Sequence, residues 1–203
     1  MTETAVVVTP KRADAVFDWW RRNCSNADGS AGTRARLRRC RSVNDAVSEP
    51  AALLLARIVG ALAPGDSSAR SRRVASALAA AVVLAHVREH DERTLVRQLG
   101  WSAFPGDGTT ESTAERPGLS EVRFKRLMQV RDPDELLTHV TRLVSLSDGK
   151  VNVRELSRAL LRWDDIQRQR WAFQYYAADI AAPPSNTAVS YTHLRAHETK
   201  ANL

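Results

Sequence analysis

The stretch Ala75-Ser-Ala-Leu-Ala-Ala-Ala-Val-Val-Leu-Ala-His-Val87 decides the fold class of this chain of 203 residues. It is apolar almost throughout, and Arg88 and Glu89 follow it directly. Alanine and leucine are strong helix formers, so the stretch predicts a helix, which we expect from about Ser71 to His90. Because the apolar run is too short to span a bilayer, it predicts a buried helix and no membrane partner.

Segments on both sides of this stretch carry helical signals as well. Upstream, apolar spacing predicts one helix from near Asp14 and another that opens at Ser48-Glu-Pro50, since proline is tolerated in a first turn. Downstream, Asp132-Pro-Asp-Glu135 supplies an N-cap, a first-turn proline and a capping-box glutamate. A capping box at Asn152 predicts one long last helix reaching about residue 177. No stretch alternates as a β-strand does.

The predicted fold is therefore all-α, a two-lobed helical bundle. We expect an N-terminal helical lobe with a basic segment over 1–101 and a C-terminal helical lobe over 119–184. Residues 102–118 between them are rich in Gly, Ser, Thr and Pro and lack periodicity, which predicts a mobile loop. Residues 185–203 continue no helical face and resemble translated sequencing adapter, so we expect a non-native tail.

The charge balance is strongly basic. Thirty Lys and Arg residues oppose 23 Asp and Glu, which gives a net charge of +7 and an isoelectric point near 10.1. Nearly all the cations are arginines, whose planar fork of donors suits phosphate oxygens, although a GC-rich genome would favour arginine too. Cys24 and Cys40 are too few for a disulfide framework or a metal cage. Without a signal peptide or a long apolar span, the chain is expected to be cytoplasmic.

The basic stretch Thr33-Arg-Ala-Arg-Leu-Arg-Arg-Cys-Arg41 holds five arginines within nine residues. Cations this close repel one another unless a polyanion or an acidic surface compensates them. No acidic residue lies at helical spacing within the stretch, so it predicts phosphate binding. The alternative is a solvated charged face.

Two further basic elements have stronger structural alternatives. Residues 120–131 combine cations with an apolar stripe, which is also typical of an ordinary amphipathic helix. On the last helix, Asp164 and Asp165 can neutralise part of a third group: Arg154, Arg158, Arg162, Arg168 and Arg170. Aromatic residues near the end of that helix can stack on bases, but at helical spacing they are more often core.

One catalytic pattern occurs, His86-Val-Arg-Glu89-His90, in the H-x-x-E-H order of inverted zincins. Two histidines four apart on one helix can bind zinc, with the glutamate as general base. The alternative is that His86 ends a buried helix and the other two residues lie in its solvated last turn. Since Walker, dinucleotide and nucleophile-elbow motifs are absent, we expect no enzyme and no cofactor.

Three blocks in order resemble the CasB family, the small subunit of the type I-E CRISPR complex Cascade. They are a tryptophan helix followed by residues 34–39, residues 119–136, and Leu160-Leu-Arg-Trp163 leading to residues 170–176. The resemblance covers about residues 13–178. It implies a non-catalytic helical protein that binds other Cascade subunits and a second copy of itself. It further implies contact with crRNA and target DNA, and R-loop stabilisation by holding the displaced non-target strand.

The expected nucleic-acid-binding residues come from two sources. The positions that match basic contact residues of the family are Arg38, Arg39, Arg123, Arg126 and Arg142. Charge alone adds Arg34, Arg36, Lys125, Arg131, Arg162 and Arg168. A helix-turn-helix regulator remains an alternative, although the predicted helices near Ser120 and Asn152 carry few side chains suited to base edges. An adaptor that binds acidic protein surface remains another.

Overall fold

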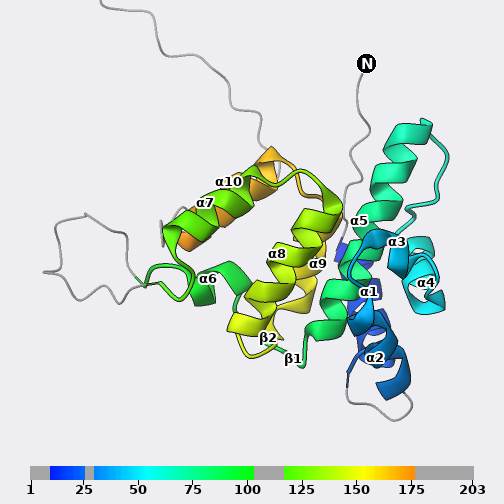
Figure 1. The fold of residues 1–203 in the computed structure, drawn as a ribbon, viewed down its shortest axis with the longest axis horizontal. Helices are drawn as coiled ribbons and strands as arrows, with labels where there is room; N and C mark the ends of the chain where they lie inside the picture. Colours follow the sequence, from blue (N-terminus) through cyan, green and yellow to red (C-terminus); the bar gives the residue numbers. More distant parts are fainter. Residues whose placement is uncertain (1–9, 26–29, 103–116, 177–203) are drawn as a thin grey trace, which may run out of the picture.

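The computed structural model describes residues 10–25, 30–102 and 117–176 and confirms an all-α fold (Figure 1). The first half contains α1 (Pro10–Asn23), α2 (Ala31–Arg39), α3 (Val43–Ala46), α4 (Pro50–Ile58), α5 (Ser67–His86), β1 (Glu89–His90) and α6 (Leu95–Leu99). The second contains α7 (Glu121–Gln129), α8 (Pro133–Leu146), β2 (Lys150–Val151), α9 (Val153–Leu161) and α10 (Asp165–Tyr175).

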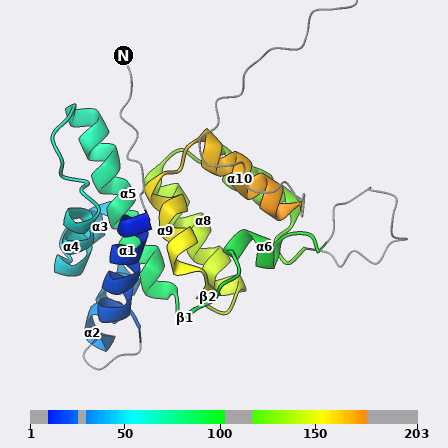
Figure 2. The same ribbon diagram turned by 180° about the vertical axis from the view of Figure 1, so that it is seen from behind.

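Helix α5 is the centre of the fold. Every residue from Ala77 to Ala85 is buried, as expected for a helix that is apolar on all sides. The small alanine side chains allow α2, α3 and α4 to pack on one side of α5, while α8 and α9 pack on the other (Figures 1 and 2). The prediction of a buried helix from the apolar stretch 75–87 is therefore confirmed.

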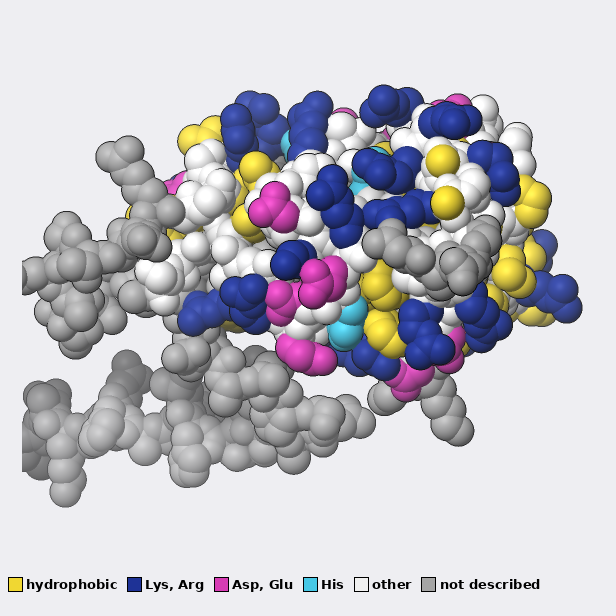
Figure 3. Space-filling view, turned by 90° about the horizontal axis from the view of Figure 1, so that it is seen from below, with side chains coloured by type: hydrophobic (Ala, Val, Ile, Leu, Met, Phe, Trp, Pro, Cys, Tyr) yellow, Lys and Arg dark blue, Asp and Glu magenta, His cyan; other side chains and the backbone are white. Residues whose placement is uncertain are grey.

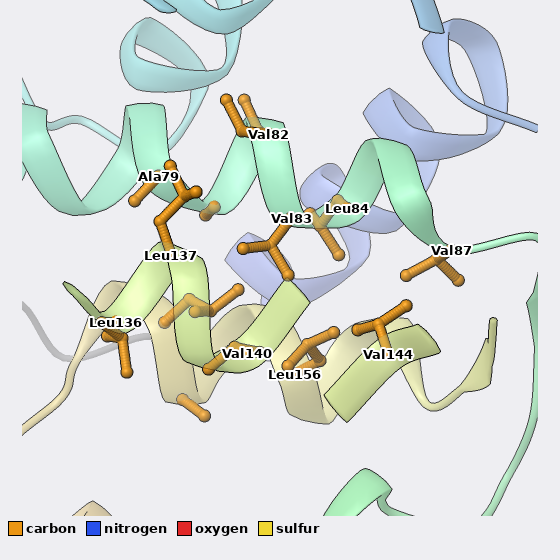
Figure 4. Packing of buried hydrophobic residues seen from close by; sticks show 14 of the residues in the cluster. Ala79, Val82, Val83, Leu84, Val87, Leu136, Leu137, Val140, Val144 and Leu156 are labelled. Carbon is orange, nitrogen blue, oxygen red and sulfur yellow. The ribbon is translucent and has the colours of Figure 1, made fainter. Parts of the chain in front are cut away.

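The contact between α5 and α8 shows how this centre is packed. Val83 lies above Val140 and Val87 above Val144, with Leu156 of α9 beside them (Figure 4). On the other side of the molecule α1 packs along α9 (Figure 2). Buried residues of both halves of the chain form one hydrophobic cluster. The division into two lobes stays a prediction.

Several helix starts follow the sequence signals. The Asp132 carboxylate accepts hydrogen bonds from the backbone N–H groups of Asp134 and Glu135, at 2.9 and 3.1 Å, and Pro133 opens α8. The Asn152 side chain accepts from the Glu155 N–H at 3.0 Å. Each cap satisfies backbone donors that the first turn of a helix leaves free.

The prediction of one long last helix is wrong. The chain leaves helical geometry at Arg162 and restarts at Asp164, whose carboxylate caps α10 by accepting from the Gln167 N–H at 2.8 Å. The turn lets α10 lie beside α7 and away from α9 (Figure 1). There the Tyr175 ring stacks on Phe124 with centroids 3.9 Å apart, and its hydroxyl donates to the Leu119 carbonyl at 2.6 Å.

Three boundaries also differ from expectation. The first helix begins at Pro10, before Asp14. Helix α5 begins at Ser67, because Asp66 caps it, and ends at His86. The chain then forms β1, which pairs in parallel with β2, so the expectation of no strand is wrong for these two short segments. Isolated pairs of this length carry no alternating pattern that a sequence could reveal.

Parts of two predictions lie outside the described residues. The expected mobile loop falls largely on residues 103–116, and the expected non-native tail falls within residues 177–203. Among the residues that the structure describes, no helix combines the length and the apolar character needed to cross a membrane.

Candidate nucleic-acid interface

The predicted contact residues fall into two structural groups. Members of the first group already have a hydrogen bond or ion pair within the chain, and Arg34 and Arg36 are two of them. The Arg34 guanidinium donates to the carbonyls of Ala85 and Val87, at 3.0 and 3.3 Å, where α5 ends. Burial and then the neighbouring charge of Arg38 lower the pKa of Arg34. Arg36 pairs with Glu49 at 3.1 Å. The acidic partner that is missing along α2 is thus supplied by the start of α4.

Lys125 and Arg131 on α7 also have partners within the chain. Lys125 pairs with Glu121 at 3.2 Å, one turn earlier on the same helix. Arg131 donates to the carbonyls of Met128 and Val130, at 3.0 and 3.1 Å, and so closes the last turn of α7. The donors of Lys125 and Arg131 are therefore already bonded to acceptors within the protein.

The last two members of the first group, Arg162 and Arg168, have their partners in the turn between α9 and α10. Arg162 pairs with Asp164 at 2.5 Å. Arg168 is only 9% exposed, pairs with Asp165 and donates to the Trp163 carbonyl at 3.3 Å. A guanidinium buried in this way orders the turn and offers little surface to a ligand.

The second group consists of exposed arginines that have no hydrogen bond or ion pair with any described residue. Its members are Arg38, Arg39, Arg123, Arg126 and Arg142. They are the positions chosen through family resemblance, whereas every position added from charge alone belongs to the first group. Their donors are available to an external anion.

The charges of three of these arginines, Arg38, Arg126 and Arg142, act on two histidines. Burial and then the charges of Arg38, Arg41 and Arg34 lower the pKa of His86 to about 4. Burial and then Arg142 lower the pKa of His139, an effect that Arg126 reinforces and Glu135 opposes. The His86 imidazole is therefore neutral near pH 7. For both histidines the charge of a neighbouring arginine is the largest influence on the pKa after burial.

The two histidine neighbourhoods lie on adjoining segments. The Val43 N–H, two residues after Arg41, donates to the Asp134 carboxylate at 2.5 Å, which ties the α2–α3 link to the start of α8. From below, Lys and Arg side chains spread across the molecule with histidines among them (Figure 3). We call one set of residues the basic face: Arg38, Arg41, His86, Arg126, His139 and Arg142.

Sequence reasoning missed three residues of the basic face. Arg41 belongs to the basic stretch and could have been included on charge, whereas His86 was considered only for zinc. His139 gives no sequence signal, because an isolated histidine on a helix does not reveal its neighbours. Arg39 and Arg123 are exposed on α2 and α7, but no electrostatic influence on either histidine links them to the basic face.

The zinc alternative fails on geometry. Helix α5 ends at His86, and Glu89 and His90 lie in β1, so the histidines do not share a helix. The His90 Nδ1 atom accepts from the Val153 N–H at 3.2 Å, and Glu89 pairs with Lys150 at 3.3 Å. Across the described ranges, no group of three or more His, Cys, Asp or Glu residues is placed to hold a metal ion.

The C-terminal aromatic residues are mainly core, as expected. Trp171 and Tyr175 are fully buried, and Trp163 meets Trp171 edge to face. The Trp171 indole donates to Glu155 Oε1 at 2.8 Å, while the buried Oε2 atom has no partner among the described residues. Burial raises the pKa of Glu155 to about 7, an effect that this hydrogen bond partly opposes.

Comparison with known proteins gives two significant matches and one negative result. A sequence model of the CRISPR-associated protein Cse2 matches residues 33–176. Among solved structures, the chain is similar to CasB from Thermus thermophilus, with a TM-score of 0.52 and 25% sequence identity. That alignment covers 82% of this chain and 98% of the other. Among curated proteins, none matches the sequence significantly.

Proposed function

The chain belongs to the family of the CRISPR-associated protein Cse2, and from this premise we propose that it is a non-catalytic, nucleic-acid-binding subunit of the type I-E complex Cascade. In this role it stabilises the R-loop and holds the displaced non-target DNA through arginine–phosphate contacts in antiviral defence. Its partners are the other Cascade subunits, a second copy of itself, crRNA and target DNA.

The observation that carries the proposal is the basic face. Three exposed arginines from three helices, Arg38, Arg126 and Arg142, have no acidic partner among the described residues. Guanidinium groups in this state bind phosphate oxygens without first breaking an internal ion pair. In an R-loop, base pairing between the guide RNA and the target strand supplies the sequence specificity. A supporting subunit therefore needs only positive charge placed along the phosphate backbone.

Family membership favours this role over the helix-turn-helix regulator. A recognition helix contacts base edges with residues near its start, where α7 exposes Val122, Arg123 and Lys125. Its exposed amide, Gln129, lies at the opposite end of the helix. Strand exchange in an R-loop is nearly balanced in free energy, so a few phosphate contacts are sufficient to shift it.

The test is the lifetime of an R-loop in reconstituted Cascade. The variant Arg38→Ala/Arg126→Ala/Arg142→Ala removes three free guanidiniums, and we expect R-loops that dissociate at least about tenfold faster. The matched variant Arg36→Ala/Lys125→Ala/Arg162→Ala removes the same charge from side chains that are already paired, and it should leave the lifetime nearly unchanged. Equal lifetimes for the wild-type chain and the first variant would overturn the proposal.

A further inference from the structure

An open groove, with charged and polar residues along both walls, lies between α7 and α8. Its volume is about 490 Å³, within the range of small-ligand sites. The α7 wall is formed by Arg126, Gln129 and Val130. The α8 wall is formed by Asp134, Glu135, Thr138 and His139. We call this feature the α7–α8 groove.

The groove adjoins the basic face and shares two residues with it, Arg126 and His139. Arg142 lies one turn further along α8 and acts electrostatically on the same imidazole. A strand whose phosphates bind Arg126 and Arg142 therefore runs along the mouth of the groove. One of its bases can then turn into the groove.

The α8 wall has the wrong charge for phosphate. The exposed Glu135 carboxylate has no hydrogen bond or ion pair with any described residue, and Asp134 uses Oδ1 to accept from the Val43 N–H. Carboxylates repel phosphate oxygens but accept N–H groups, and the cytosine N4 amino group is their usual partner among base edges. Thymine has no exocyclic amino group to donate.

The remaining lining residues suit an unstacked base. The His139 imidazole is a planar group on which a base can stack. The Gln129 amide and the Thr138 hydroxyl can donate or accept at the ring edge. Base edges are accessible in this way only in a single strand.

We propose that the α7–α8 groove binds an amino-bearing nucleobase, cytosine foremost, of the single strand that the basic face holds, with Glu135 accepting the amino N–H. This inference rests on the proposed function and deepens it. A subunit that grips backbone through Arg126 and Arg142 then also has a base preference.

The test uses the full chain and two single-stranded homo-oligonucleotides of equal length, oligo-dC and oligo-dT, at one salt concentration. We expect the wild-type chain to bind oligo-dC about fivefold more tightly. Glu135→Ala should abolish this preference, and Glu135→Gln should retain part of it, because the amide oxygen still accepts. Asp18→Ala is the matched control, since it removes an exposed carboxylate from α1 and should keep the preference.

Equal wild-type affinity for the two oligonucleotides, or a preference that persists in Glu135→Ala, would overturn the groove proposal. Tight, salt-dependent binding without preference would leave phosphate holding intact, so the two proposals can fail separately. Binding of neither oligonucleotide would also remove the groove proposal, and the R-loop lifetime would then decide the proposed function. Thermal unfolding of each variant checks that it is folded.

Discussion

The basic face and the α9–α10 region are both rich in arginine, yet their arginines have different environments. In the α9–α10 region Arg154 pairs with Asp14 at 2.8 Å and lies 4.0 Å from the centroid of the Phe17 ring, while Arg162 and Arg168 pair with aspartates of the turn. In the basic face burial is the largest influence on the pKa of both histidines, and the charge of an exposed arginine, Arg38 or Arg142, comes next. Local acidic partners therefore decide whether an arginine stabilises the fold or remains free for a ligand.

The largest expected effect comes from removing the free arginines. Arg38→Ala/Arg126→Ala/Arg142→Ala should weaken binding to single-stranded DNA by about 100-fold at low salt, because each phosphate contact contributes about 1 kcal/mol or more. Fluorescence anisotropy with a labelled strand measures the loss. An effect below threefold would show that the basic face does not carry the binding.

The next effect concerns the buried arginine of the other region. Arg168→Ala should lower the free energy of unfolding by about 2 kcal/mol, because Asp165 loses its partner and the Trp163 carbonyl loses a donor. Denaturant titration measures the change. DNA affinity should stay within twofold of the wild type, and a large loss of affinity in a folded variant would erase the distinction between the regions.

A pH-dependent effect is expected at Glu155. Because its pKa is raised from 4.5 to about 7 in the folded state, its favourable contribution is present below pH 4.5 and is lost as the pH rises through 7. Glu155→Gln keeps the acceptor for Trp171 and should stabilise the protein by about 1–3 kcal/mol at pH 8, with little effect near pH 4.5. A pH-independent difference would contradict this assignment.

The smallest expected effect is at His86. Its lowered pKa of about 4 leaves the imidazole neutral at pH 7.5, so His86→Gln should change DNA affinity by less than twofold there. On acidification from pH 6.5 to 4 the unfolded state takes up the proton more readily, so the wild type should lose more stability than the variant. Equal acid sensitivity of the two proteins would contradict this prediction.

The sequence predicted the fold class because its strongest signals are local. The apolar run ending at His86 and the caps at Asp132 and Asn152 act within a turn or two of their own positions. The break at Trp163 was missed, because Asp164, which caps α10, was interpreted as neutralising the arginines of the last helix. The strands were missed because each is only two residues long.

The candidate site was less predictable, because it depends on partners that are distant in sequence. No local signal near Arg36 indicates its pairing with Glu49. The role of Arg34 depends on the carbonyl of Ala85, 51 residues later, near the end of α5. Counting charge therefore selected basic side chains that already have partners within the protein. Family resemblance selected arginines without a partner among the described residues, because positions shared by a family carry information about surfaces that composition does not contain.

The central claim is that only arginines without an internal partner grip the backbone, and the salt dependence of binding tests it most directly. Log affinity for a single strand should fall with log salt by about 0.7 per phosphate contact. Losing the three contacts of Arg38, Arg126 and Arg142 should reduce the slope by about 2 units. Arg36→Ala/Lys125→Ala/Arg162→Ala should leave it unchanged, whereas an equal reduction in both variants would contradict the claim.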